Sequence, residues 1–261
     1  MRKTITTMVL AVCIVLFLFC CGKLYQVRKE YSEGTETYEK LDTRFITALP
    51  QITEPQETDL EECHAIQETA PIKVDFDGLI AENSDVVAWL YCPDTLINYP
   101  VMQAENNEKY LRTLPDGTWN IAGTLFMDYR NAADFSDSNS IVYGHNMKND
   151  SMFGILPDYN TQEFYEAHPY WYLLTPNTDY KVELIAGYVT PSTSDAYAIP
   201  RTQEEKESLI QTTLSSSAFI TNVEIDTTDK LLTLSTCSYE YSNARFVLVG
   251  VLRELAKQNN D

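Results

Sequence analysis

The hydrophobic pattern begins with one long uncharged run near the N-terminus. Ile5 to Gly22 contains no charged residue and is mostly apolar, and Arg2 and Lys3 precede it. This length is near the lower limit of about 17–25 residues for a helix that spans a bilayer. We therefore expect residues 1–4 to be a cytoplasmic tail and residues 5–22 to be a transmembrane signal anchor.

Two kinds of processed segment compete with the anchor. A cleaved signal peptide needs small residues before its cleavage site, but the run ends in Phe19-Cys20-Cys21-Gly22. A lipoprotein cysteine at Cys20 or Cys21 would also follow bulky residues. The pattern thus favours an uncleaved anchor. Basic residues flank the run on both sides, so the size of the downstream domain, rather than charge bias, favours export of the C-terminal side.

A polar and acidic stretch follows the apolar run, rich in Glu and Thr with scattered Pro. Its first part, to about Leu49, has helix-forming residues, whereas Pro50 through Pro71 is typical of a flexible spacer. Residues 23–71 are therefore expected to form an extracellular stalk, with a helix in its first part, that holds a folded domain away from the membrane.

The folded domain is expected over residues 72–255, followed by a tail at 256–261. Apolar residues have helical spacing from Phe76 to Leu90, and a capping box at Thr202 and Glu205 opens a helix over Gln203–Ser217. Short runs rich in Val, Ile, Tyr and Thr predict strands. The pattern favours a mostly β fold, a barrel or sandwich decorated by helices. The runs are Leu96–Met102, Thr124–Asp128, Ser140–Tyr143, Tyr170–Thr175, Tyr180–Val189, Lys230–Thr236 and Arg245–Leu252.

Charge and cysteine placement exclude several functions. The formal net charge of −19 argues against nucleic acid and against anionic lipid, which both require clustered Lys and Arg. Six cysteines are present without a CxxC pair, and Cys63-His64 has no second pair at metal spacing. We therefore expect no metal, no cofactor and no disulfide scaffold, and we interpret Cys92 as a core residue.

Cys237 is the cysteine whose surroundings suggest chemistry. In the strand Lys230–Thr236, Leu232 and Leu234 point to one face, so Cys237 would join the opposite face with its small hydroxyl residues. A thiol at the polar end of a strand suits a nucleophile, although free cysteine is also common as a small core residue.

A nucleophilic thiol usually works with a histidine, and the chain has three. His64 lies in the spacer. His168 ends a short predicted helix, where a capping role is expected. His145 follows the strand Ser140–Tyr143 through Gly144, which allows a sharp exit at a sheet rim. His145 is therefore the candidate acid/base.

Arg245 is the candidate for stabilising a negatively charged oxygen. It begins the strand that follows Cys237, eight positions later. In an antiparallel hairpin the two residues would lie near the same end of the pair. Arginine keeps its charge and offers several donors to an oxyanion, although an edge-strand surface charge is the simpler alternative.

Four motifs, which follow one another along the chain in the family's order, resemble the sortases. Three of them resemble the class B branch specifically. The similarity covers roughly Phe76 to Leu252. The motifs are Thr233-Leu234-Ser235-Thr236-Cys237 followed by Arg245-Phe246-Val247-Leu248-Val249; Asn98-Tyr99-Pro100-Val101-Met102-Gln103; Phe126-Met127-Asp128-Tyr129-Arg130-Asn131; and Tyr143-Gly144-His145-Asn146-Met147 with Met152-Phe153.

The resemblance implies a closed eight-stranded β-barrel with N-terminal helices and a helix before the penultimate strand. It implies that Cys237 attacks the Thr carbonyl of a C-terminal sorting signal similar to Asn-Pro-x-Thr-Asn and forms a thioester. His145 would be the acid/base and Arg245 would steady substrate and oxyanion. An amine of a peptidoglycan cross-bridge or lipid II would then release the secreted protein onto the cell wall, outside a Gram-positive membrane.

The resemblance also implies a peptide-binding groove. Leu111, Thr193, Tyr197 and Ser235 match its positions, and the backbone N–H of Ser238 would complete an oxyanion hole. Two alternatives stay open: a cysteine protease that only hydrolyses its acyl-enzyme, and a non-catalytic surface module that binds peptides.

Overall fold

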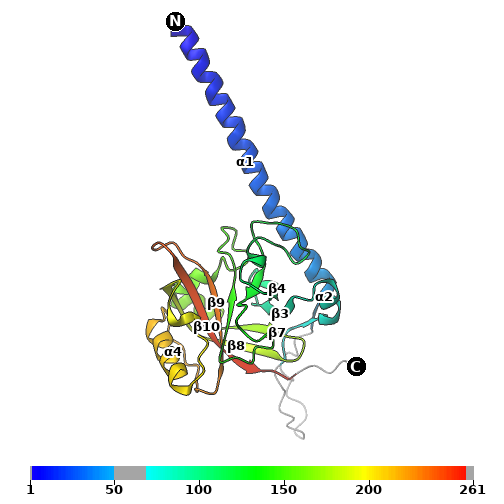
Figure 1. Cartoon of the computed structure of the whole chain (residues 1–261), viewed down its shortest axis with the longest axis vertical. Coiled ribbons are helices and arrows are strands. Elements are labelled where there is room, and N and C mark those ends of the chain that lie inside the picture. The colour runs from blue at the N-terminus through cyan, green and yellow to red at the C-terminus, as the bar shows by residue number, and fades with distance from the viewer. Residues whose placement is uncertain (1, 50–68, 257–261) are drawn as a thin grey trace, which may run out of the picture.

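The strand-forming runs close into a barrel. The computed structural model describes residues 2–49 and 69–256, and in that part of the chain eight strands close in the order β10-β8-β7-β3-β4-β5-β6-β9 (Figure 1). The closed barrel confirms the predicted mostly β class. The strands are β3 (Val86–Tyr91), β4 (Asn98–Met102), β5 (Leu125–Met127), β6 (Asn139–Tyr143), β7 (Tyr170–Leu174), β8 (Asp179–Pro191), β9 (Lys230–Cys237) and β10 (Ala244–Glu254).

Two strand pairs in the barrel are parallel, β4 with β5 and β6 with β9. The remaining neighbours are antiparallel, including β9 with β10. Parallel neighbours place their C-terminal ends at the same rim. The residues that follow β6 and the end of β9 therefore meet at one edge of the barrel.

Side-chain alternation along β9 separates two apolar layers. Leu232 and Leu234 lie in the barrel interior with Phe246 and Trp171, whereas Leu231 packs in an outer cluster that includes α4 residues. This is the predicted alternation, because successive side chains of a strand point to opposite faces. Cys237 belongs to the outer, polar set.

The helices are short except for the first. They are α1 (Arg2–Phe45), α2 (Phe76–Glu82), α3 (Gln162–Ala167) and α4 (Gln203–Ser216), with 3-10 turns at Lys109–Leu111, Leu156–Asn160 and Asp195–Tyr197. In α4 the Thr202 side chain accepts from the Glu205 backbone and Glu205 accepts from the Thr202 backbone, as the capping box predicts. This helix precedes β9, the penultimate strand of the chain.

The helix predicted from Phe76 to Leu90 is wrong in its second half. Helix α2 ends at Glu82, and Asn83 has an extended backbone. From Val86 onward the residues are mostly β-branched or aromatic, and they form β3. Strand β3 was thus misread as helix, because a short apolar run fits the period of a helix as well as that of a buried strand.

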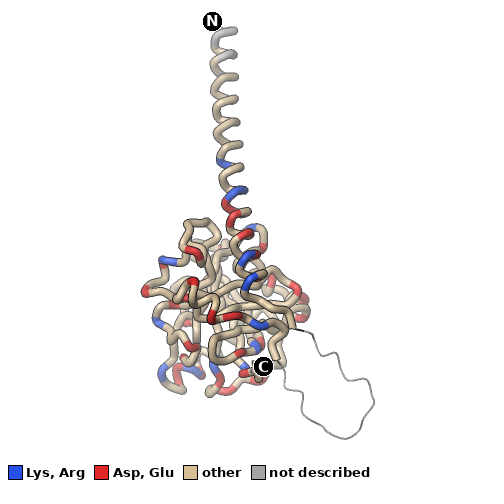
Figure 2. The backbone as a smooth tube through the Cα atoms, turned by 90° about the vertical axis from the view of Figure 1, so that its right-hand side faces the viewer, with Lys and Arg blue, Asp and Glu red and all other residues tan. Residues whose placement is uncertain are grey.

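Helix α1 is continuous from the apolar run into the folded domain. Residues 10–29 of this helix are exposed, and charged residues are few in its N-terminal half but become frequent where the helix reaches the barrel (Figures 1 and 2). There Tyr38 and Phe45 are only 6% and 4% exposed, and Asn120 donates to the Glu30 carbonyl oxygen at 2.8 Å.

The folded unit therefore includes residues that the sequence assigned to the stalk. After α1, strand β1 (Ile46–Ala48) pairs antiparallel with β2 (Ile72–Val74). The barrel domain thus begins within α1 and not at Ile72. Most of the expected spacer and most of the expected C-terminal tail lie outside the described residues.

Candidate active site

Cys237 lies at the C-terminal end of β9, half-buried, directly opposite Arg245 on β10. Directly paired residues of antiparallel strands project from the same face of the sheet. Both side chains line one cavity of about 750 Å³. The predicted proximity of Cys237 and Arg245 is confirmed.

His145 reaches the same cavity because β6 runs parallel to β9. Beyond the last strand pair, three hydrogen bonds hold the two chain segments together. The Gly144 N–H donates to the Ser235 carbonyl oxygen (3.1 Å), and Thr236 Oγ1 donates to the Gly144 carbonyl oxygen (2.8 Å). Asn146 Nδ2 donates to the Cys237 carbonyl oxygen (2.9 Å). His145 is thereby fixed beside the strand end that carries the thiol.

Gly144 is required by packing rather than by its backbone angle. The described residues with a positive φ do not include it. A Cβ at this position would lie 2.5 Å from Leu125 Cδ2 and 2.7 Å from Phe153 Cδ2. The exit of the chain before His145 therefore passes too close to the core for any side chain.

The imidazole of His145 has one ring nitrogen engaged. Its Nε2 lies 2.7 Å from the Leu111 carbonyl oxygen. A carbonyl oxygen only accepts, so Nε2 carries the proton and Nδ1 is left as an acceptor in the neutral ring. Burial lowers the pKa of His145 from its ordinary 6.5, against the hydrogen bond to Leu111, which raises it. A neutral imidazole with a free acceptor nitrogen can take a proton from a thiol.

The cavity wall is built partly from the loop between β8 and α4. Tyr197 reaches Ser235 on β9, with 2.9 Å between Tyr197 Oη and Ser235 Oγ. Thr193 lines the same cavity, as does Leu111, which is 39% exposed. The four side chains expected to bind peptide therefore surround the same space as Cys237, His145 and Arg245.

Ser238 is the exception among the expected site residues. Its backbone N–H donates to the Ala244 carbonyl oxygen at 3.0 Å, inside the turn between β9 and β10, and its side chain pairs with Glu240. The residue does not line the cavity. The expectation that this N–H completes an oxyanion hole is corrected, because the turn already uses it.

Several polar residues of the cavity were not singled out as functional from the sequence. Among them are Asn107, Asp128, Arg130 and Tyr143, all of which line the space around Cys237. The available signal was an Asp and an Arg two positions apart at the end of the apolar strand β5. Charged residues directly after a buried strand commonly face a site at the sheet rim.

The other described cysteines lack these surroundings. Cys92 is fully buried, which raises the pKa of its thiol to about 12, and Cys13, Cys20 and Cys21 are exposed on α1. Within residues 2–49 and 69–256, no group of three or more His, Cys, Asp or Glu is placed to hold a metal ion.

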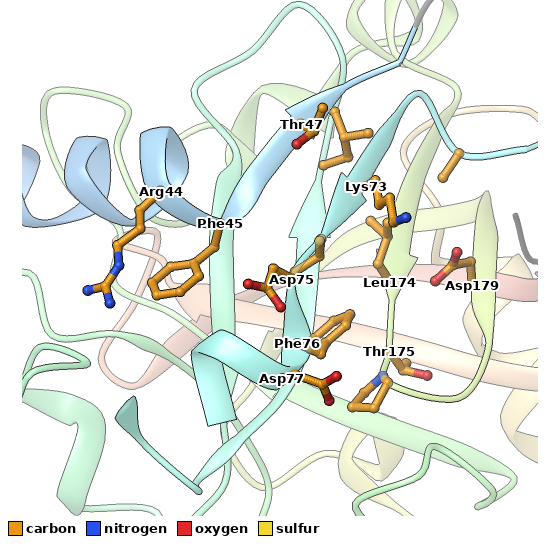
Figure 3. A pocket seen from close by; sticks show the side chains of 14 residues that line it. Arg44, Phe45, Thr47, Lys73, Asp75, Phe76, Asp77, Leu174, Thr175 and Asp179 are labelled. Carbon is orange, nitrogen blue, oxygen red and sulfur yellow. The ribbon is translucent and has the colours of Figure 1, made fainter. Parts of the chain in front are cut away.

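A second cavity, of about 670 Å³, lies between β1, β2 and the start of β8 (Figure 3). Its lining includes Lys73, Asp77 and Asp179 but neither a cysteine nor a histidine. Asp75 at its edge caps α2 by accepting from the Gly78 N–H at 3.0 Å. This cavity therefore offers no nucleophile and base of the kind that surrounds Cys237.

Comparison with known proteins agrees with this geometry. A sequence model of the sortase domain matches residues 90–253. Sortase B of Listeria monocytogenes is 40% identical over 176 residues, 65% of this chain and 70% of that protein. Sortase B of Staphylococcus aureus is 28% identical and covers 95% of both chains.

Solved structures resemble the whole fold. Sortase B from Bacillus anthracis in complex with AAEK1 matches with a TM-score of 0.69 and 29% identity, covering 87% of this chain and all of that one. A Staphylococcus aureus sortase B–substrate complex matches with a TM-score of 0.66 and 29% identity, covering 69% of this chain and 85% of that one. With its barrel, its motif order and these relatives, the chain belongs to the sortase family of cysteine transpeptidases, in class B.

Proposed function

We propose that this sortase cleaves a C-terminal sorting signal similar to Asn-Pro-x-Thr-Asn after its threonine and transfers the new C-terminus to a cell-wall amine. The observation that carries the proposal is the shared cavity of Cys237, His145 and Arg245. A related Staphylococcus aureus sortase B has been solved as a substrate complex. The substrates would be secreted proteins that carry such a signal.

The chemistry proceeds in two acyl transfers. His145 Nδ1 takes the proton of the Cys237 thiol, and the sulfur attacks the threonine carbonyl carbon. The C–N bond breaks, the leaving amine receives the proton from His145, and a thioester remains on Cys237. Arg245 donates to the oxygen that becomes negative during attack. An amine then attacks the thioester and restores the free thiol.

The amine would come from a peptidoglycan cross-bridge or lipid II. One structure that resembles this chain, at 25% identity, is a sortase B complexed with triglycine. A glycine peptide is a primary amine of the kind this second step requires. The expected product is therefore an amide between the threonine and the acceptor.

Helix α1 supports a location at the membrane. Among the described residues, this is the helix long and apolar enough to cross a membrane. No residue of its apolar window is buried by the part of the chain that the structure describes, as expected of a lipid-facing segment. We propose a single-pass membrane protein of a Gram-positive cell, with residues 1–4 cytoplasmic and the barrel outside.

An assay that mixes the full chain in detergent micelles with a sorting peptide and triglycine distinguishes transfer from hydrolysis. We expect triglycine to replace the free threonine acid with a Thr–triglycine amide, measured by mass spectrometry. Free acid alone, at every triglycine concentration, would instead make the protein a hydrolytic cysteine protease. A Cys237→Ala variant that processes the peptide as fast as the wild type would exclude the thiol mechanism.

A further inference from the structure

We infer that Asp128 is a positioning residue that holds Tyr197 in the peptide-binding wall of the cavity. The inference concerns a buried carboxylate that takes no part in the proposed acyl transfers. It rests on the proposed function where it concerns peptide binding, but its structural part can be tested without a peptide.

The Asp128 carboxylate is 1% exposed and is surrounded by donors. Arg130 donates from Nε to Oδ1 and from Nη2 to Oδ2, both at 2.9 Å. Tyr143 Oη donates to Oδ2 at 2.8 Å, and Asn107 Nδ2 donates to the same oxygen at 3.3 Å. Burial raises the pKa of Asp128, but the hydrogen bonds from Arg130 and Tyr143 and the charge of Arg130 outweigh it and hold the pKa below the ordinary 3.8. Asp128 is therefore ionised at neutral pH.

Two of these partners converge on Tyr197. Arg130 Nη2 also donates to the Tyr197 carbonyl oxygen at 3.2 Å. The Tyr143 ring stacks on the Tyr197 ring, with 6.1 Å between centroids and 20° between planes. Asp128 thus orients one group that holds the backbone of Tyr197 and a second that holds its ring.

Tyr197 in turn contacts strand β9 close to the thiol. Its hydroxyl is 2.9 Å from Ser235 Oγ, two residues before Cys237. The loop around Tyr197 has further anchors, because Asn139 Nδ2 lies 3.3 Å from the Ala196 carbonyl oxygen and 2.9 Å from that of Ala198. Those anchors hold the backbone on either side of Tyr197, whereas the partners of Asp128 hold the Tyr197 carbonyl oxygen and its ring.

Burying the Asp128 carboxylate costs free energy, which suggests that its ion pair with Arg130 serves a function besides stability. An apolar residue of similar size commonly stabilises a fold as well as a buried ion pair does. The ion pair adds bidentate geometry, which fixes a guanidinium plane in one orientation. Among the described contacts, Asp128 makes no hydrogen bond to Cys237, His145 or Arg245. Its loss should therefore change peptide affinity and leave thiol chemistry intact.

The test compares Asp128→Asn and Tyr143→Phe with the wild type, in the full chain. Asp134→Asn is the matched control, since Asp134 is an exposed aspartate of the same β5–β6 connection and lies outside the cavity lining. The readouts are KM and kcat for the sorting peptide, the rate of Cys237 alkylation by iodoacetamide followed by peptide mapping, and hydrogen exchange over residues 192–198.

For Asp128→Asn we expect KM to rise about tenfold with kcat changed less than about twofold, since binding but not chemistry is altered. Tyr143→Phe should raise KM less, because it keeps the stacked ring. Hydrogen exchange over residues 192–198 should accelerate in Asp128→Asn and in Tyr143→Phe, while the rate of Cys237 alkylation should stay that of the wild type. Asp134→Asn should leave all of these readouts unchanged.

Unchanged exchange over residues 192–198 in Asp128→Asn would overturn the positioning role. So would an alkylation rate that falls in parallel with kcat/KM, since that result indicates general loss of structure. If the wild type fails to cleave the peptide, the proposed function fails, while exchange still decides the inference. Arg130→Gln, at a side chain that is 45% exposed, repeats the exchange test should Asp128→Asn not fold.

Discussion

The reactivity of the site depends on which nitrogen of His145 is free. The Leu111 carbonyl oxygen engages Nε2, and burial keeps the ring neutral near pH 7. A neutral base with Nδ1 free can accept the thiol proton, whereas an imidazolium cannot. The hydrogen bond to Leu111 therefore selects the tautomer that the proposed first acyl transfer requires.

Nitrogen-detected NMR of imidazole-labelled protein should show His145 with Nε2 protonated and a titration midpoint below 6.5. Because folding lowers this pKa, the folded state binds fewer protons between its own pKa and the unfolded value. The free energy of unfolding should therefore decrease as pH falls through that window. A midpoint above 6.5, or a proton on Nδ1, would contradict the assignment.

Sequence reasoning predicted the cavity's reactive residues better than its supporting ones. Cys237 and Arg245 follow from strand alternation and a hairpin, both of which are local patterns. Ser238 failed because the availability of its N–H depends on the turn that brings the Ala244 carbonyl oxygen to it. Asp128 was missed because its partner Tyr143, and Tyr197 on which the Tyr143 ring stacks, are distant from it in sequence and meet only after the barrel closes.

At the scale of elements, α1 is both the candidate membrane anchor and part of the folded domain. Tyr38 donates from its hydroxyl to the Gly123 carbonyl oxygen and the Thr124 hydroxyl, and Phe45 packs with Leu79 and Trp89. The sequence indicated a helix here but not that it packs on the barrel. The apolar side chains that contact the core are few and lie within a polar stretch: Tyr31, Tyr38, Leu41 and Phe45.

Two shortened chains test this docking. A chain that starts at Val27 keeps the buried part of α1 and should melt close to the full chain. A chain that starts at Ile72 loses Tyr38, Phe45 and β1. Burial of each large apolar side chain is worth about 1.5–3 kcal/mol, so its melting temperature should fall by roughly 10 °C or more.

Circular dichroism of both shortened chains gives the answer. The chain that starts at Val27 is the control for loss of the apolar run alone. Equal melting temperatures for the two would contradict the docking and would make α1 a stalk that is separate from the domain.

At the scale of the whole molecule, barrel closure gathers residues from Asn107 to Arg245 around one cavity. The strand-forming runs predicted most of the strands, but β3 was hidden because its apolar run also fits a helix. The strand pattern left a barrel or a sandwich open, and the family resemblance selected the closed eight-stranded barrel. The parallel β6–β9 pair that sets His145 beside Cys237 was not predicted. Long-range strand order has no local signature in a single sequence.

The whole chain is strongly acidic, whereas the cavity around Cys237 contains both acidic and basic residues. The net charge of −19 is of the kind that favours solubility, while the cavity itself holds Arg130 and Arg245 beside Asp128 and Asp195. The expectation that nucleic acid is not a partner stays a prediction. The fold brings Cys237, His145 and Arg245, the proposed thiol nucleophile, base and cation, together at one cavity.

The central claim is that Cys237 carries the acyl group. The most direct test is the intact mass of the full chain, quenched in acid shortly after mixing with the sorting peptide. The wild type should gain the mass of the peptide up to its threonine, on Cys237 alone, and should lose it on treatment with hydroxylamine. Cys237→Ala should gain nothing. An adduct on another residue, or the same adduct on Cys237→Ala, would contradict the account.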